Sequence, residues 1–263
     1  MLSRPLTVVK IGGALLGAGP ERGALWRGIA RMLTEGPVVI VHGGGPQSTA
    51  LARRLGHEPR IVAGRRVTTD LDLDVAAYAL RGHANATVVA GAASAGIPAV
   101  GISALDGGLI RAVRRPPREI DGETVDFGHV GDVVAVDVRL VRLLLSGGFV
   151  PVVAPLAADA DGHLLNVNAD TVACALAGAL AADRFYLVTE TGAVRRDAAD
   201  ASTALATLDR ATLAAGVADG WISGGMRPKL DVAVAALDAG IPHVVVLGPD
   251  ALGAPETGTR VVG

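Results

Sequence analysis

Two lysines stand apart in a chain that otherwise uses arginine. The sequence holds 24 Lys and Arg residues together, and only Lys10 and Lys229 are lysines. An ammonium group is a compact point charge, whereas guanidinium is a wide planar fork. Phosphoryl transfer needs charges at fixed places around the moving group. The two retained lysines therefore suggest a site that handles phosphate or another anion.

Glycine-rich stretches follow two expected strands. "VVKIGG" ends at Gly13, and "VIVHGGGPQS" carries three consecutive glycines, residues 43–45. Glycine lets the backbone approach a ligand closely, and N–H groups at a helix start attract anions. Neither stretch is a Walker A motif, because no glycine directly precedes a lysine, and the second lacks the third glycine of the dinucleotide fingerprint. A single junction fits a tight turn equally well, but two of them, one with a lysine, favour an anion site.

Two further stretches carry polar residues suited to an anionic ligand. Arg65 and Arg66 precede a helix in "GRRVTTD". An arginine fork binds carboxylate or phosphate through two bonds, and an ordinary surface pair is the alternative. "LLNVNADTV" places Asn166, Asn168 and Asp170 at the start of an apolar helix, where capping explains one of them. The second lysine follows two glycines in "ISGGMRPK", early in another expected helix.

Composition excludes several other classes. The formal net charge of −2 argues against a nucleic-acid partner, which usually meets a basic surface. The single Cys174 excludes an intramolecular disulfide and a multi-cysteine metal site, and the six histidines show no metal-ligand spacing. No signal peptide and no membrane span is expected, so we expect a cytoplasmic protein without a membrane partner.

The elements that must position these residues are those of an α/β protein. Short β-branched runs alternate with longer helical patterns, which predicts a parallel sheet with crossover helices. We expect strands at 7–11, 38–41, 99–102, 149–154, 184–188 and 243–247, and helices at 21–33, 47–55, 73–95, 138–146, 169–180 and 226–239. Ligand sites of such sheets lie at the carboxyl ends of the strands.

One stretch differs from the parallel pattern. Residues 109–134 show the alternation and the Asp-Gly turn of a β-hairpin, which we expect to stand beside the main sheet. The basic run "RAVRRPPR" within it is typical of a solvated hairpin face. The polar residues 195–203 are expected to form an exposed loop.

The motifs "VVKIGG", "VIVHGGGPQ", "GRRVT", "NVNAD" and "GGMRPK", in this order and spacing, resemble the amino acid kinase family. The resemblance runs nearly end to end and includes "GISALDGGLIRA" and "VDFGHVGDV". It implies an α/β fold, a three-layer αβα sandwich with a mainly parallel central sheet, plus the β-hairpin excursion. It also implies an N-terminal lobe (1–168) for an acylated amino acid and for dimerisation, and a C-terminal lobe (169–263) for ATP.

The resemblance also implies a role for each motif residue. Lys10 and Lys229 flank the transferred phosphoryl group, and Asp170 holds both ammonium groups as an organiser, not as a base. The remaining roles are N–H donors to the phosphoryl group (Gly13, Gly44), substrate contacts (Gly44, Gly45, Asn166, and Arg66 on the α-carboxylate) and nucleotide contacts (Gly12, Thr189, Glu190, Ile222, Ser223, Gly225).

Within the family, the motifs are most similar to those of members that phosphorylate the γ-carboxylate of N-acetyl-L-glutamate, a step toward arginine, with ATP as co-substrate and Mg²⁺. That carboxylate is already an anion, so the reaction needs no general base but needs positive charge against the ATP phosphates. One alternative is a kinase of α-aminoadipate borne on an acidic carrier protein, for which the basic run offers a surface. Another is a non-catalytic amino-acid-binding module on the same fold.

Two stretches depart from the family's pattern. "TETGA", residues 189–193, stands where Thr-Asp-Val-Pro-Gly is usual, and Asn85-Ala86 stands where Asn-Lys is common.

The first expected strand begins at about residue 7, which leaves no room for the N-terminal helix that links arginine-inhibited members into hexamers. We therefore expect a homodimer with weak or no inhibition by arginine.

Overall fold

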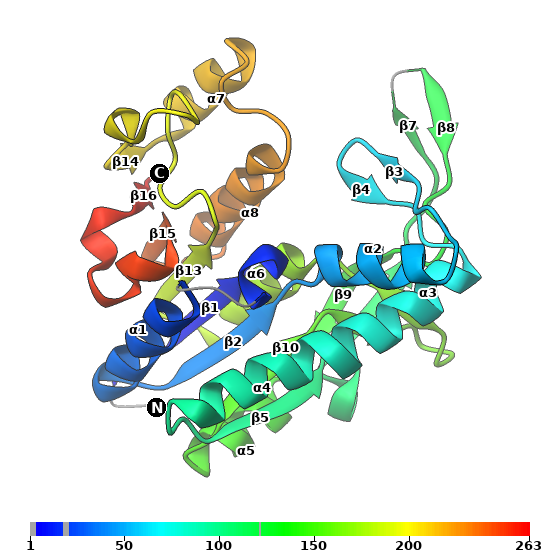
Figure 1. The fold of residues 1–263 in the computed structure, drawn as a ribbon, viewed down its shortest axis with the longest axis horizontal. Helices are drawn as coiled ribbons and strands as arrows, with labels where there is room; N and C mark the ends of the chain where they lie inside the picture. Colours follow the sequence, from blue (N-terminus) through cyan, green and yellow to red (C-terminus); the bar gives the residue numbers. More distant parts are fainter. Residues whose placement is uncertain (1–3, 18–20, 121) are drawn as a thin grey trace.

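The centre of the molecule is an eight-stranded sheet in the order β14-β16-β15-β13-β1-β2-β10-β5 (Figure 1). The computed structural model describes residues 4–17, 21–120 and 122–263. Six of the strands run parallel, and they are the six predicted ones, each within one residue at either end. They are β1 (Thr7–Ile11), β2 (Val38–His42), β5 (Ala99–Ser103), β10 (Val150–Ala154), β13 (Arg184–Val188) and β15 (His243–Leu247).

Two short strands that the sequence did not predict complete one edge of this sheet. β16 (Thr259–Val261) pairs antiparallel with β15, and β14 (Thr207–Leu208) pairs parallel with β16. Strands of two and three residues are too short to show an alternating pattern, so only their neighbours define them.

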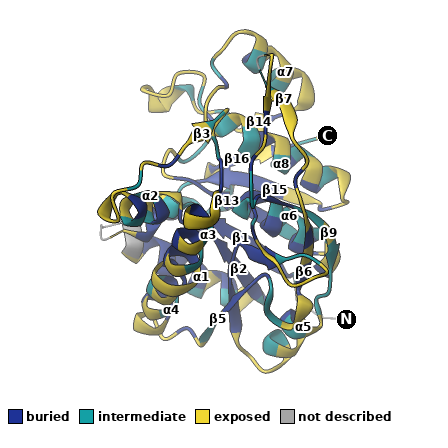
Figure 2. Cartoon of the chain, turned by 90° about the vertical axis from the view of Figure 1, so that its right-hand side faces the viewer, coloured by how far each residue is buried: buried dark blue, intermediate teal, exposed yellow. Residues whose placement is uncertain are grey.

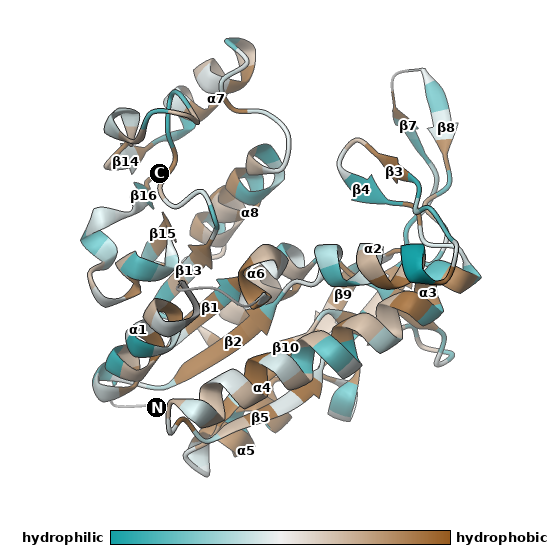
Figure 3. Ribbon diagram, viewed as in Figure 1, coloured by the Kyte–Doolittle hydropathy of each residue, from teal (hydrophilic) through white to brown (hydrophobic). Residues whose placement is uncertain are grey.

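Helices cover both faces of the sheet and complete the predicted three-layer sandwich. Alternate residues of each strand enter opposite cores: Val9 packs in the core of one face and Val8 in the core of the other. The central strands are buried and apolar (Figures 2 and 3). The first core contains α1 (Glu21–Glu35) and α4 (Asn85–Ser94), and the second contains α5 (Arg139–Ser146), α6 (Ala169–Leu180) and α8 (Met226–Asp238).

The helix predicted at 73–95 consists of three consecutive segments. It begins with α3 (Asp70–Ala76), continues as the π-helix η2 (Ala77–Ala84) and ends with α4. A capping box starts it three residues early, because the Thr69 hydroxyl accepts from the Asp72 amide while the Asp72 carboxylate accepts from the Thr69 amide. The π-helical segment carries no signal in the sequence.

A four-stranded sheet in the order β12-β11-β6-β9 and two small hairpins lie beside the main sheet. β6 and β9 pair antiparallel, as do β7 and β8, which confirms the predicted excursion; residue 121 of its Asp-Gly turn lies outside the described residues. In Figure 1 the hairpins β3–β4 and β7–β8 project upward on one side of the molecule, and α7 lies on the other. These elements are β3 (Ile61–Val62), β4 (Arg65–Arg66), β6 (Ile110–Arg114), β7 (Arg118–Ile120), β8 (Glu123–Val125), β9 (Gly131–Val136), β11 (Leu156–Ala158), β12 (Leu164–Asn166) and α7 (Arg210–Ala218).

The remaining elements of the described residues are α2 (Gly45–Arg54), which begins at the last of the three consecutive glycines, and five 3-10 helices. The latter are η1 (Gly13–Leu16), η3 (Asp106–Gly108), η4 (Ala201–Thr203), η5 (Pro249–Gly253) and η6 (Pro255–Thr257). In the part of the chain that the structure describes, no helix has the length and apolarity needed to cross a membrane.

Candidate active site

A buried ion pair lies where β1 meets the start of α6. Lys10 is 5% exposed, and its Nζ lies 2.8 Å from Oδ1 of Asp170. The two groups form an ion pair, but their angles are not those of a hydrogen bond. Asn168 caps α6, since its Oδ1 accepts from the amides of Asp170 at 2.8 Å and Thr171 at 3.2 Å. The cap leaves the Asp170 carboxylate free for Lys10. Removing two charges from water costs several kcal/mol per ion, which points to a role beyond stability.

Lys229 approaches the same place from α8. Its Nζ donates to the carbonyl of Gly225 at 2.8 Å. Burial lowers the pKa of Lys229; the Asp170 carboxylate opposes this and the Lys10 ammonium adds to it. The two lysines and Asp170 therefore interact electrostatically, but only Lys10 is in direct contact with the carboxylate among the described residues.

The two glycine stretches touch each other in front of the ion pair. A Cβ on Gly13 would lie 2.8 Å from the amide nitrogen of Gly44. The Gly43 amide donates to the Ile11 carbonyl at 2.8 Å, and Gln47 of α2 donates to the Gly13 carbonyl at 2.9 Å. Gly44 also stands at the N-terminus of α2, where the helix dipole favours anions. This arrangement fixes the backbone of both glycine stretches at a helix N-terminus that favours anions.

Gly13→Ala is expected to lower kcat by about 100-fold, since its methyl group must push the two loops apart and a displacement of about 1 Å at a reacting centre costs about that much. A coupled assay of ADP release measures the effect. Gly82→Ala is the matched control, because a Cβ there meets nothing within 4 Å. Equal kcat in both variants would contradict a role for the Gly13–Gly44 contact.

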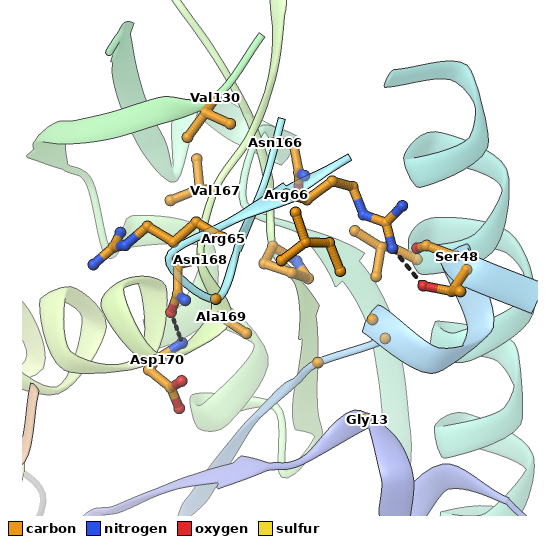
Figure 4. A pocket seen from close by; sticks show the side chains of 18 of the residues that line it. Gly13, Ser48, Arg65, Arg66, Val130, Asn166, Val167, Asn168, Ala169 and Asp170 are labelled. Carbon is orange, nitrogen blue, oxygen red and sulfur yellow. Dashed lines mark hydrogen bonds between the residues drawn. The ribbon is translucent and has the colours of Figure 1, made fainter. Parts of the chain in front are cut away.

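A cavity of about 350 Å³ opens on one side of the ion pair. Its wall includes every residue assigned to the acyl amino acid and to its reaction except Lys229: Lys10, Gly13, Gly44, Gly45, Arg66, Asn166 and Asp170. Arg65 and Arg66, neighbours on β4, point to opposite sides of it (Figure 4).

The Arg66 guanidinium group is held in place by two neighbours and keeps one nitrogen without a hydrogen bond among the described residues. Its Nη2 donates to Oγ1 of Thr49 at 2.6 Å, and its Nη1 lies 3.7 Å from Oδ1 of Asp72. Nη1 is buried and has no hydrogen-bond partner among the described residues. Buried donors are nearly always satisfied, so this nitrogen is a donor that an acceptor from outside the chain can use. Asn166 is turned toward Thr68, whose hydroxyl accepts its amide at 3.2 Å.

The far end of this cavity is more cationic than the sequence suggested. Arg115, from the run expected on a solvated face, is 5% exposed, pairs with Asp132 at 2.6 Å and lies over the Phe127 ring. Burial, and then the charges of Arg115 and Arg118, lower the pKa of Arg65. A basic run gives no sign of which arginine turns inward, so this residue was missed.

A second cavity, of about 500 Å³, lies on the other side of β1. Its wall contains all six residues assigned to the nucleotide, Gly12, Thr189, Glu190, Ile222, Ser223 and Gly225, together with Lys10, Gly13 and Lys229. The altered "TETGA" stretch forms its own turn, in which the Thr189 hydroxyl donates to the Gly192 carbonyl at 2.9 Å and Gly192 adopts a φ of 73°. Trp221 also lines this cavity and was not predicted.

His42, at the end of β2, is fully buried directly before residues 43–45, here called the glycine loop. Its Nδ1 lies 2.8 Å from the Gly43 carbonyl oxygen, and its Nε2 lies 3.1 Å from the Asn85 amide nitrogen. Burial lowers the pKa of His42 from 6.5 to about 4, against the smaller opposite effect of the Gly43 bond. The imidazole is therefore neutral in the folded protein at neutral pH.

This burial predicts an acid-sensitive fold. Between its folded pKa of about 4 and its unfolded value of 6.5, His42 binds a proton in the unfolded state only, so stability falls as pH falls through that window. The loss from about pH 7 to about pH 5 is about 2 kcal/mol in the free energy of unfolding. Urea titrations at both pH values measure it. His42→Asn is expected to remove this part of the pH dependence, whereas His83→Asn, at an exposed site, leaves it in place.

A parallel α/β sandwich that sets two lysines and two touching glycine loops between adjoining cavities has the architecture of a small-molecule phosphotransferase. The family model described as "Amino acid kinase family" matches residues 5–247. The chain belongs to the amino acid kinase family.

Individual relatives agree with this assignment. The chain is 45% identical over 246 residues to a protein named acetylglutamate kinase from Anaeromyxobacter sp. (strain Fw109-5), covering 92% of this chain and 90% of the relative. It is 40% identical to one of the same name from Methanopyrus kandleri, covering 94% and 96%. A crystal structure of a Streptococcus mutans UA159 protein superposes with a TM-score of 0.81 at 25% identity, covering 98% of both chains.

Proposed function

We propose that the protein transfers the γ-phosphoryl group of ATP to the γ-carboxylate of N-acetyl-L-glutamate, giving N-acetyl-γ-glutamyl phosphate and ADP in the cytoplasm, for arginine biosynthesis. Relatives named acetylglutamate kinase at 40% and 45% identity support the substrate. The single observation that carries the proposal is the Lys10–Asp170 pair between two cavities, both of which Lys10 and Gly13 line.

The chemistry follows from the placement of charge. Residues 1–168 would form the lobe that holds the acyl amino acid, with Arg66 on its α-carboxylate, and residues 169–263 the lobe that holds ATP. Lys10 and the glycine N–H groups would meet the transferred phosphoryl group from one side and Lys229 from the other. Asp170 orients Lys10 and accepts no proton. Each well-placed donor of this kind is worth roughly 2.7–4 kcal/mol of transition-state stabilisation.

Magnesium would enter with the nucleotide. Among the described residues, Asp170 and Glu190 are the carboxylates that line the two cavities, and Asp170 already pairs with Lys10. Mg²⁺ prefers oxygen ligands and keeps several waters, so the ATP phosphates and water would supply most of its ligands, and Glu190 is the lining carboxylate left to approach it.

Assembly and a second substrate are also proposed. β5 forms one edge of the main sheet, and the open backbone groups of an edge strand would allow it to pair with a second copy in a homodimer. Weak or absent arginine inhibition remains our prediction. The one observation on the side of the second candidate, a kinase of α-aminoadipate or glutamate linked to an acidic carrier protein, is the positive charge of Arg65 and of the exposed Arg118 near the cavity.

A substrate panel tests the proposal. Purified protein with MgATP is offered N-acetyl-L-glutamate, N-acetyl-aminoadipate and the carrier-linked amino acid, and ADP release is followed. Turnover of free N-acetyl-L-glutamate at millimolar concentration is expected. Turnover of the carrier-linked form alone would favour the second candidate. Ligand binding without ADP release with any of the three would identify a binding module.

A further inference from the structure

The back of the glycine loop is held by a buried polar cluster that has no role in the function proposed above. Asn85, 6% exposed, is the first residue of α4. Its Nδ2 lies 3.1 Å from Nε2 of His42, 3.2 Å from the carbonyl of Ile102 and 2.9 Å from that of Val152. One side-chain amide therefore joins β2, β5 and β10.

The hydrogen bonds define the state of the imidazole. A carbonyl oxygen only accepts, so the 2.8 Å contact between His42 Nδ1 and the Gly43 carbonyl requires a proton on Nδ1. In the neutral ring Nε2 is then an acceptor, and Asn85 Nδ2 donates to it, with its two hydrogens shared among three acceptors. Asn85 thus selects the tautomer in which His42 donates to Gly43.

This donation acts on the N–H group that faces the ligand. The Gly43 carbonyl and the Gly44 amide belong to one planar trans peptide, so fixing the carbonyl fixes the direction of the amide. Among the described residues, the Gly44 N–H donates to no protein acceptor. Gly44 lies against Gly13, on the wall of the 350 Å³ cavity that Arg66 and Asn166 also line.

The π-helix η2 places side chains that pack against Gly44 directly before Asn85 in the chain. A Cβ on Gly44 would lie 2.4 Å from Cδ2 of Leu80, within η2, and 3.5 Å from Cβ of Ala84, its last residue. Asn85 follows directly. On the other side, a Cβ on Gly101 would lie 2.0 Å from Oδ1 of Asn85, so only glycine fits opposite the amide. π-helical turns are rare in proteins overall, and those that occur are often found at functional sites.

We propose that Asn85 and His42 are positioning residues that orient the Gly43–Gly44 peptide, so that the Gly44 N–H points at the transferred phosphoryl group. The inference rests on the proposed function, since the phosphoryl group is the ligand of that N–H. Neither residue touches substrate; both act through the peptide plane.

The first test compares kinetics and binding in Asn85→Ala. We expect kcat to fall at least tenfold while KM for N-acetyl-L-glutamate and for ATP stays within threefold, because the oriented N–H acts on the transition state. Affinity for ADP with aluminium fluoride and N-acetyl-L-glutamate, a mimic of that state, is expected to fall by the same factor, and affinity for ADP alone to stay unchanged. Val88→Ala is the control, because it removes buried atoms from the next turn of α4 without touching the loop.

Two conservative variants of His42 separate its two bonds. The side-chain amide of His42→Asn reaches the position of Nδ1 and can donate to Gly43, whereas that of His42→Gln reaches the position of Nε2 and cannot. We expect His42→Asn to keep kcat within fivefold and His42→Gln to lose at least tenfold. In the His42→Asn background, Asn85→Ala is expected to cost less than in the parent. Nitrogen-15 NMR of labelled histidine adds a readout free of turnover: Nδ1–H in the parent, and a mixture of tautomers in Asn85→Ala.

The inference is overturned if Asn85→Ala matches Val88→Ala in kcat at equal loss of thermal stability, if the two His42 variants are equally active, or if His42 carries its proton on Nε2. Turnover by the parent protein is measured first. No ADP release by the parent would count against the proposed function, and the tautomer measurement would still decide the state of His42.

Discussion

Lys10→Arg is expected to lower kcat by about 100- to 1,000-fold, the cost of losing one well-placed donor at a developing charge. Lys10 is buried and contacts Asp170 at 2.8 Å, so a longer, planar guanidinium cannot place its charge where the ammonium lies. Lys229→Arg is expected to act in the same direction from the ATP side. Formal charge is unchanged in both variants, so a loss reports placement rather than charge.

The coupled ADP assay measures this loss at saturating substrates, with the thermal midpoint as a check on folding. Arg142→Lys, on the exposed face of α5, is a matched exchange that is expected to leave kcat unchanged. Retention of kcat within tenfold in both lysine variants would refute the proposed mechanism.

Asp170→Asn is expected to reduce both activity and stability. The change leaves the Lys10 ammonium buried without a counter-charge, which costs about 3–5 kcal/mol in the free energy of unfolding. A lysine that is no longer held in place also loses about 100-fold in kcat. Urea denaturation and the ADP assay measure the two effects on one preparation.

A double variant separates these two roles of Asp170. Lys10→Met combined with Asp170→Asn removes both charges, so most of the lost stability should return while activity stays absent. If the double variant remained as unstable as Asp170→Asn alone, the buried unpaired charge would not be the cause of the instability.

Regular elements could be predicted where local pattern and burial agree. β1, β13 and α6 lie at their predicted bounds, since apolar β-branched runs and an Asn-capped alanine-rich helix are strong local signals. The residues expected around the phosphoryl group also lie together, because the carboxyl ends of parallel strands meet at one edge.

The parts that were missed depend on long-range contacts. The π-helical segment forms between α3 and α4, where Leu80 packs against a glycine loop more than thirty residues earlier in the chain. Arg115 turns inward because Asp132 and Phe127 meet it there, and neighbouring arginines of the same run stay exposed. His42 reads as an ordinary strand end in the sequence, and only Asn85 and Gly43 give it a role.

Lys10 and Gly13 line both cavities, one on each side of the end of β1. For inhibitor design, this means that the two hollows can be addressed by one molecule. On the proposed function, an N-acyl glutamate joined through a short acidic linker to an adenosine phosphate would occupy both and place the linker against Lys10. Such a compound would make the contacts of both cavities, while the translational and rotational entropy of only one association is lost.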